Sequence, residues 1–181
     1  MNLVSSLIAD VPDWPKPGVV FKDITPLLAS PEGLRQAVDA IVASAPEAID
    51  VVVGMEARGF IFATPVALAL GAGFVPVRKP GKLPRPVLSE SFDLEYGTAT
   101  LTMHADALVA GARVLIVDDV LATGGTIAAT AALLKRLGAE LVHVSVLLEL
   151  TALGGREKLA EQGVIDGSDA QKAEAIRKHF V

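Results

Sequence analysis

The stretch VLIVDDVLATGGT, residues 114–126, joins three kinds of local structure. The apolar run at its start predicts a buried β-strand, and the glycine pair near its end predicts a tight turn. The segment TIAATAALLKRLGA, residues 126–139, has the apolar spacing and the late glycine of a helix. A strand that passes through a short turn into a helix is the repeating unit of an α/β fold.

Segments on both sides repeat this alternation of strand and helix. Short apolar runs predict strands at 50–55, 74–79, 98–104, 113–119 and 141–150, and helical patterns cover 31–45, 60–70 and 126–139. We therefore expect a mostly parallel, twisted sheet flanked by helices. Ligands of such sheets bind at the carboxyl ends of the strands. The loops MEARGF (55–60), RKPGK (78–82) and DDVLATGGT (118–126) should then open onto one rim.

Three other regions lack this pattern. The first thirty residues are marked by prolines and predict irregular chain rather than a separate domain. Residues 80–97 are polar and proline-rich, over a length that predicts a functional or mobile loop. The end of the chain, EQGVIDGSDAQKAEAIRKHFV, predicts a polar turn and a short helix capped by Ser168 or Asp169. We expect residues 1–181 to form a single domain.

Composition narrows the class of protein. A formal net charge of −5 argues against a nucleic-acid-binding surface, which is usually basic. The sequence has no cysteine, which excludes disulfides and thiolate chemistry and fits a reducing cytoplasm. The first residues show no basic segment typical of a targeting signal. The uncharged stretch 60–77 is interrupted by two prolines and two glycines, so we interpret it as helix, turn and strand rather than a membrane span.

The segment ATGGT has the features of a phosphate-binding turn. Gly124 and Gly125 allow backbone conformations that direct successive N–H groups inward, and the following helix adds its positive end. Thr123 and Thr126 add hydroxyl donors. No lysine closes the turn, so it is not the nucleoside-triphosphate pattern GxxxxGK[ST]. The alternative is a tight strand-to-helix turn that needs glycine for geometry alone.

Asp118 and Asp119 make the phosphate interpretation more specific. Two like charges at the end of a buried strand repel each other and lose hydration. A divalent cation or the hydroxyl groups of a sugar would compensate for this. A sugar diol beside a phosphate site indicates a ribose 5-phosphate. The alternative is a solvated acidic pair at the edge of the sheet.

The chain resembles a known family at this motif and at five others. VLIVDDVLATGGT is similar to the phosphoribosyl-diphosphate signature of type I phosphoribosyltransferases. The other segments resemble the adenine phosphoribosyltransferases and stand in that family's order: PGVVFKDITPLL (17–28), GMEARGFIF (54–62), RKPGKLP (78–84), SFDLEYGTA (91–99) and ELTALGGREKL (149–159). The resemblance covers about residues 11–159.

The resemblance implies an enzyme that transfers a phosphoribosyl group. The family joins adenine to 5-phosphoribosyl 1-diphosphate and releases AMP and diphosphate, with Mg²⁺ as cofactor. Asp118 and Asp119 would face the ribose hydroxyls. Arg58 would act on the diphosphate in catalysis, together with the basic turn RKPGK. The alternative for RKPGK is a solvated turn at the surface. The expected substrate-binding residues are Ala122, Thr123, Gly124, Gly125 and Thr126 for the 5-phosphate, with Arg78, Lys79 and Lys82 for the diphosphate.

Two further segments take roles from the same resemblance. Residues 80–97 correspond to a mobile lid, in which Glu95 is the general acid or base near the purine nitrogens and Tyr96 is its neighbour. Residues 1–30 correspond to a hood over the base, in which Phe21 stacks on adenine and the backbone of Val20 and Lys22 reads its edge. A core aromatic is the alternative for Phe21. The carboxylates would not form an all-protein metal site, since Mg²⁺ in such enzymes keeps water and substrate ligands.

Some expectations concern the whole chain. Similar enzymes are homodimers that bind small molecules and neither nucleic acid nor membrane. The tail, residues 160–181, departs from the family's hydrophobic strand and puts that edge of the sheet in doubt. Two other functions stay open: transfer to another base such as orotate, and regulation by binding phosphoribosyl diphosphate without catalysis.

Overall fold

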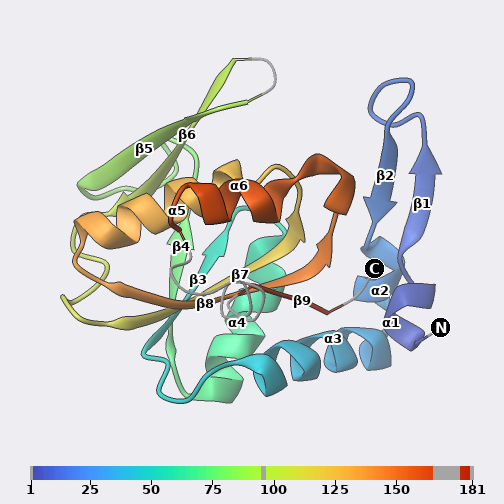
Figure 1. The fold of residues 1–181 in the computed structure, drawn as a ribbon. Coiled ribbons are helices and arrows are strands. Elements are labelled where there is room, and N and C mark those ends of the chain that lie inside the picture. Colours follow the sequence, from blue (N-terminus) through green and yellow to red (C-terminus); the bar gives the residue numbers. More distant parts are fainter. Residues whose placement is uncertain (1, 95–96, 165–175, 180–181) are drawn as a thin grey trace.

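Five parallel strands form the central sheet (Figure 1). The computed structural model describes residues 2–94, 97–164 and 176–179. Strand order across the sheet is β4-β3-β7-β8-β9, and all neighbouring pairs are parallel. The strands are β3 (Val51–Met55), β4 (Gly73–Val77), β7 (Arg113–Leu121), β8 (Glu140–Glu149) and β9 (Ile176–Lys178). The α/β sheet expected from the sequence is therefore confirmed.

Helices cover both faces of this sheet. The long helices are α3 (Pro31–Ser44), α4 (Gly59–Leu70) and α5 (Gly125–Arg136), and α6 (Gly155–Glu161) is shorter. Figure 1 shows α3 and α4 on one side of the strands and α5 with α6 on the other. Alternate residues of each buried strand enter the two layers: Val52 packs in the core that includes α4, and Val53 in the core that includes α5.

Local signals set the ends of these helices. Ser30 caps α3, because its Oγ accepts a hydrogen bond of 3.1 Å from the Gly33 N–H, and Pro31 occupies the first helical position. Helix α5 ends at Arg136, three residues before the expected boundary. Gly138 follows with φ +73°, and the Ala139 N–H bonds to the Leu134 carbonyl at 3.0 Å.

The first thirty residues are more regular than the sequence predicts. They contain α1 (Leu3–Ser6), the antiparallel pair β1 (Ala9–Pro12) and β2 (Val20–Asp23), and α2 (Thr25–Ala29). Two of the four prolines, Pro15 and Pro17, lie in the turn between the strands, where the Trp14 N–H bonds to the Val19 carbonyl at 3.2 Å. The prediction of irregular chain was wrong because proline at a hairpin tip does not prevent pairing on either side.

The expected loop 80–97 also contains a strand. Strand β5 (Val87–Asp93) pairs antiparallel with β6 (Thr98–His104), and both rise away from the central sheet in Figure 1. Alternate β5 residues are exposed, which is the period of a strand with one covered face. Arg78 and Thr102 connect this hairpin to the sheet through two backbone hydrogen bonds, of 2.9 and 2.7 Å.

The end of the chain adds the strand at one edge of the sheet. Residues 176–178 pair with β8 in parallel register, where the sequence predicted a helix. Ser168 and Asp169, the expected caps of that helix, lie outside the described residues. Within the described ranges, no helix is both long and apolar enough to cross a membrane.

Candidate active site

A pocket of about 380 Å³ lies at the carboxyl ends of β3 and β7. The chain leaves β3 for β4 on one side, while β7 lies on the other side of β3. Such a change of direction in strand order is where parallel sheets bind ligands. The pocket is lined by Glu56, Ala57, Arg58, Asp118, Asp119, Val120, Leu121, Ala122, Thr123, Gly124, Thr126 and Ile127. Two of the three expected rim loops therefore meet here.

The turn predicted to bind phosphate, residues 122–126, which we call the phosphate loop, connects β7 to α5. Gly124 has φ +82°, a left-handed conformation that glycine adopts without steric cost, and α5 begins at the next residue. Twelve residues of helix place a positive dipole end beside the pocket. Gly125 packs closely on the β5–β6 hairpin, since a Cβ there would stand 2.6 Å from Phe92 Cδ2. The loop thus combines N–H groups at a helix start with a fixed backbone, as an anion site requires.

Asp118 and Asp119 are buried together, with 8% and 6% of their surface exposed. The Asp119 N–H donates to Asp118 Oδ1 at 2.9 Å. Burial raises the pKa of Asp118 well above its ordinary value, and the neighbouring Asp119 charge raises it further. Burial also raises the pKa of Asp119, although Arg58 opposes this. The burial excludes the solvated acidic pair and leaves carboxylates suited to hydroxyl donors or a cation.

Arg58 joins the paired acids to the N-terminal hairpin. Its Nε lies 2.6 Å from Asp119 Oδ2, and its guanidinium carbon lies 5.3 Å from the centre of the Phe21 ring. That ring packs edge-on against Trp14 at 4.4 Å. Phe21 is only partly buried and lies outside the two apolar cores. Phe21 therefore lies at the margin of the pocket, where it contacts Arg58. The alternative that Phe21 is a core aromatic is wrong.

The third rim loop meets the pocket through one arginine. Arg78 Nε bonds to Glu56 Oε2 at 2.8 Å, and its Nη1 donates to the Lys82 carbonyl at 3.3 Å. Lys79 and Lys82 are exposed and do not line the pocket. For these two lysines the solvated basic turn stays open. The Glu56–Ala57 peptide in the opposing loop is cis.

The remaining predicted residues are less closely placed. Val20 lies on β2 with 51% of its surface exposed. Lys22 pairs with Asp10 across the hairpin, with 2.6 Å between Nζ and Oδ1. Glu95 and Tyr96 lie outside the described residues, so their expected roles stay predictions.

Comparisons with known proteins fit this geometry. Residues 22–177 match the family model of the phosphoribosyl transferase domain. An adenine phosphoribosyltransferase from Cutibacterium acnes is 68% identical over 163 residues, which are 90% of this chain and 92% of that protein. The chain belongs to the adenine phosphoribosyltransferase family.

Solved structures of adenine phosphoribosyltransferases have the same fold. The enzyme from Thermoanaerobacter pseudethanolicus has a TM-score of 0.87 and 44% identity, covering 98% of this chain and 96% of its own. The Saccharomyces cerevisiae enzyme, solved with D-2,5-dideoxy-2,5-imino-altritol 1,6-bisphosphate and adenine, has a TM-score of 0.82 and 39% identity. That match covers 86% of this chain and 92% of the yeast chain.

One charged residue of the pocket was not predicted from the sequence. Glu56 belongs to the EARGF loop, but only Arg58 of that loop received a role. The Glu56 side chain is 12% exposed and holds Arg78 by an ion pair. Its position directly after a buried strand was the available signal, as it was for the paired aspartates.

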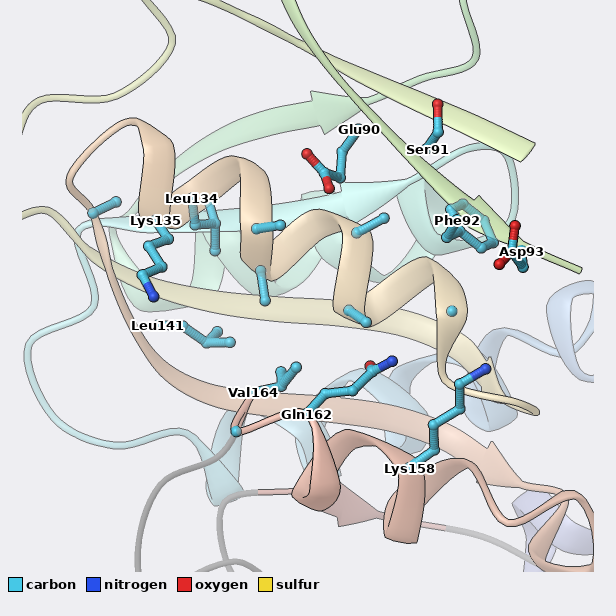
Figure 2. A pocket seen from close by; sticks show the side chains of 17 residues that line it. Glu90, Ser91, Phe92, Asp93, Leu134, Lys135, Leu141, Lys158, Gln162 and Val164 are labelled. Atoms are coloured by element: carbon cyan, nitrogen blue, oxygen red, sulfur yellow. The ribbon is translucent and has the colours of Figure 1, made fainter. Parts of the chain in front are cut away.

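A larger hollow, of about 710 Å³, lies on the outer side of α5 (Figure 2). Figure 2 shows Phe92 and Glu90 from β5 above the helix, with Lys158 and Gln162 of the α6 region below it. Of the predicted site residues that the structure describes, Gly125 alone lines this hollow. The buried acids, Arg58 and four residues of the phosphate loop line the smaller pocket instead.

Proposed function

We propose that the pocket between residues 56–58 and the phosphate loop transfers the 5-phosphoribosyl group of 5-phosphoribosyl 1-diphosphate to adenine. The products are AMP and diphosphate, as the family assignment implies. The observation that carries this proposal is the buried pair Asp118–Asp119 directly before the glycine start of α5. Carboxylates beside an anion site match a sugar diol attached to a phosphate. The hollow beside α5 offers no such combination.

The phosphate loop and the paired acids hold the sugar in this proposal. N–H groups of Ala122–Thr126 bind the 5-phosphate at the positive end of α5. Asp118 and Asp119 accept hydrogen bonds from the ribose hydroxyls. Arg58 pairs with Asp119 in the structure. When the substrate binds, the ribose hydroxyls would take the place of Arg58 at Asp119, and the diphosphate would take the place of Asp119 at Arg58. Two buried like charges thereby gain neutral partners.

Arginines then support departure of the diphosphate. Breaking the bond at the anomeric carbon leaves positive character on the sugar and negative charge on the leaving group. Arg58 lines the pocket, and Arg78 is fixed beside it by Glu56. Preorganised cations stabilise the developing charge without moving during the reaction. Holding both substrates in line contributes in the same direction. Lys79 and Lys82 would add to this field once the diphosphate is bound.

The residues present fit Mg²⁺ as the cofactor. The described chain holds no cluster of three or more possible metal ligands, but the buried carboxylates of Asp118 and Asp119 supply hard oxygen donors beside the sugar site. Magnesium in such sites takes most of its ligands from substrate and water. When bound with the diphosphate, it would neutralise charge on the leaving group as a Lewis acid.

The hood and the lid complete the proposal within one domain, residues 1–181. Residues 1–30 cover the base: Phe21 stacks on adenine, and the backbone of Val20 and Lys22 reads its edge. The lid, residues 80–97, closes over the reacting bond and excludes water. Glu95 exchanges the proton of the purine ring nitrogen, with Tyr96 beside it. The contact between Phe21 and Arg58 supports a hood at this pocket.

We also propose a cytoplasmic homodimer. Helix α4 is apolar along most of its length, and three of its four exposed residues, Ile61, Thr64 and Leu68, follow helical spacing. Leu68 is 78% exposed. An exposed helix stripe with large apolar side chains and no charge fits a contact with a second copy. The absence of cysteine supports a reducing compartment.

Steady-state assays of diphosphate release and nucleotide formation test the proposed reaction. With adenine, guanine and orotate as separate substrates, adenine should give the highest kcat/KM. Turnover of another base in preference to adenine would overturn the assignment of the hood. Binding of phosphoribosyl diphosphate without turnover of any base would instead indicate a regulatory protein.

A substitution in the paired acids tests the sugar site. Asp119→Asn should lower kcat/KM for phosphoribosyl diphosphate roughly ten- to hundredfold, the worth of a hydrogen bond to a charged group. Asp106→Asn is the matched control, because Asp106 is 66% exposed and pairs with Arg85 at the surface. Equal kinetics for the two variants would remove Asp119 from the ribose site.

A further inference from the structure

The loop that binds phosphate has a second layer behind it, formed by residues 149–159, which we name the back segment. Gly155, the first residue of α6, lies against the backbone of Ala122: a Cβ on Gly155 would stand 2.2 Å from the Ala122 carbonyl oxygen. The contact is mutual. A Cβ on Gly124 would stand 2.9 Å from the Gly155 carbonyl oxygen and 3.1 Å from Leu159 Cγ. Neither backbone leaves room for a side chain on the other.

An ion pair fixes the back segment at its start. Glu149, the last residue of β8, has a side chain only 6% exposed. It accepts two hydrogen bonds from Arg156, at 3.1 Å from Nε to Oε1 and 2.9 Å from Nη2 to Oε2. Such a two-point contact sets the orientation of the guanidinium as well as its distance. Arg156 directly follows Gly155, so the pair holds Gly155 relative to the sheet.

Two further contacts connect the back segment to the site. The Leu150 N–H bonds to the Leu121 carbonyl at 2.8 Å, which joins the ends of β8 and β7. Leu159 is fully buried in the same core as Ile127 of α5. The segment is therefore attached to the strand before the phosphate loop and to the helix after it.

We infer that the back segment positions the phosphate loop through Gly155, and that the Glu149–Arg156 pair sets this position. The inference rests on the proposed function above. No residue of the back segment lines the described pocket, so these are positioning residues and not catalytic ones. Close packing transmits a displacement of less than an ångström, because a protein interior leaves little free volume. A shift of the Ala122 carbonyl would turn the neighbouring N–H groups away from the phosphate.

Gly155→Ala tests the contact directly. We expect KM for phosphoribosyl diphosphate, and Kd for ribose 5-phosphate measured by calorimetry, to rise tenfold or more. KM for adenine should stay within twofold of its original value. Gly154→Ala is the neighbouring control: unlike Gly155, this residue has a left-handed backbone, with φ +64°, so the added Cβ costs stability, but that Cβ would be 3.8 Å from the nearest atom. The control should keep the original affinity for ribose 5-phosphate.

The ion pair is tested by variants that separate folding from positioning. Arg156→Lys keeps the charge but loses the planar two-point contact, and we expect about a threefold rise in KM for phosphoribosyl diphosphate. Glu149→Gln and Arg156→Met each remove one charge of the pair and should lower Tm. Combining them should recover Tm, since both charges of the pair are then removed, while KM for phosphoribosyl diphosphate stays raised.

Several outcomes would overturn the inference. Unchanged affinity for ribose 5-phosphate in Gly155→Ala would show that the contact does not position the loop. If Gly155→Ala fails to fold, the ion-pair variants decide. An unchanged KM for phosphoribosyl diphosphate in both Arg156→Lys and the Glu149→Gln/Arg156→Met double variant would also show that the back segment does not position the loop. Failure of the proposed function is distinguishable, because the unsubstituted protein itself would then form no AMP from adenine and phosphoribosyl diphosphate.

Discussion

At the scale of single residues, burial of the Asp118 and Asp119 carboxylates lowers the free energy of unfolding. Because burial raises the pKa of Asp118 in the folded protein, the native state keeps a proton at pH values where the unfolded chain has lost it. The free energy of unfolding therefore falls as pH rises from the ordinary aspartate value of 3.8 toward the raised one. Above that interval the full cost of the buried charge remains.

Asp118→Asn should relieve this cost without removing the Oδ1 atom that accepts the Asp119 N–H. We expect a higher Tm at neutral pH, by about 2–4 °C for each kcal/mol gained in a chain of this size. The gain should shrink as the pH falls toward 3.8 and vanish below it, where the aspartate is protonated in both states. Calorimetric scans of both proteins without ligand, from about pH 4 to neutral, measure it. A gain independent of pH would contradict the electrostatic cause.

Gly124 offers a second test at this scale. Gly124→Ala forces a side chain into φ +82°, against the back segment. We expect a loss of about 1–2 kcal/mol of stability from the left-handed backbone, together with weaker binding of ribose 5-phosphate. Gly111→Ala has φ +81° in open space away from the pocket and should lose stability alone. Equal binding by the two variants would show that the phosphate does not use this turn.

At the scale of elements, the β5–β6 hairpin is attached to α5. Arg136 donates to the Ser89 carbonyl at 2.6 Å, and Phe92 packs on Gly125 at the helix start. The proposed lid is thus connected to the phosphate loop through one helix. Its base is ordered structure rather than loop.

Arg136→Ala should loosen this attachment. Loss of about 1 kcal/mol of local hydrogen bonding corresponds to roughly fivefold faster amide exchange. We expect the increase in residues 87–93 and 98–104, with little change in β7 and β8. Hydrogen–deuterium exchange of the intact protein measures it. Arg113, which pairs with Glu140 at the other end of the sheet, provides a control variant, Arg113→Ala, that should leave the hairpin unchanged.

Elements with a strong local period could be predicted from sequence, and those formed by pairing could not. Strands β3 and β7 contain apolar runs that are each followed by a charged residue, so their positions could be predicted directly from the sequence. Strand β5 was missed because Pro80, Pro84 and Pro86 suggested loop, while its register depends on β6. Strand β9 has only three residues, and pairing with β8 rather than its own sequence makes it a strand.

The candidate site likewise has a part that local sequence motifs predict and a part that depends on contacts between distant residues. Paired acids and glycines after one strand indicated the sugar and phosphate site without further information. The Arg58–Asp119 and Glu56–Arg78 pairs join residues distant in sequence, and no local pattern reports such contacts. The role of Gly155 depends on the approach of two backbones and was equally hidden.

At the scale of the whole molecule, the α4 stripe predicts the assembly. Leu68→Lys places a charge in the proposed contact, which should convert a dimer to a monomer while circular dichroism stays unchanged. Val109→Lys is the control, since Val109 is 76% exposed outside α4. Light scattering after gel filtration gives the mass of each protein. A Leu68→Lys variant that remains dimeric would place the interface elsewhere.

The most direct test of the central proposal is a crystal structure of the protein soaked with AMP. We expect the phosphate on the N–H groups of Ala122–Thr126, the ribose hydroxyls on Asp118 and Asp119, and adenine beside Phe21. Nucleotide density in the hollow between α5 and β5, with the phosphate loop empty, would contradict it.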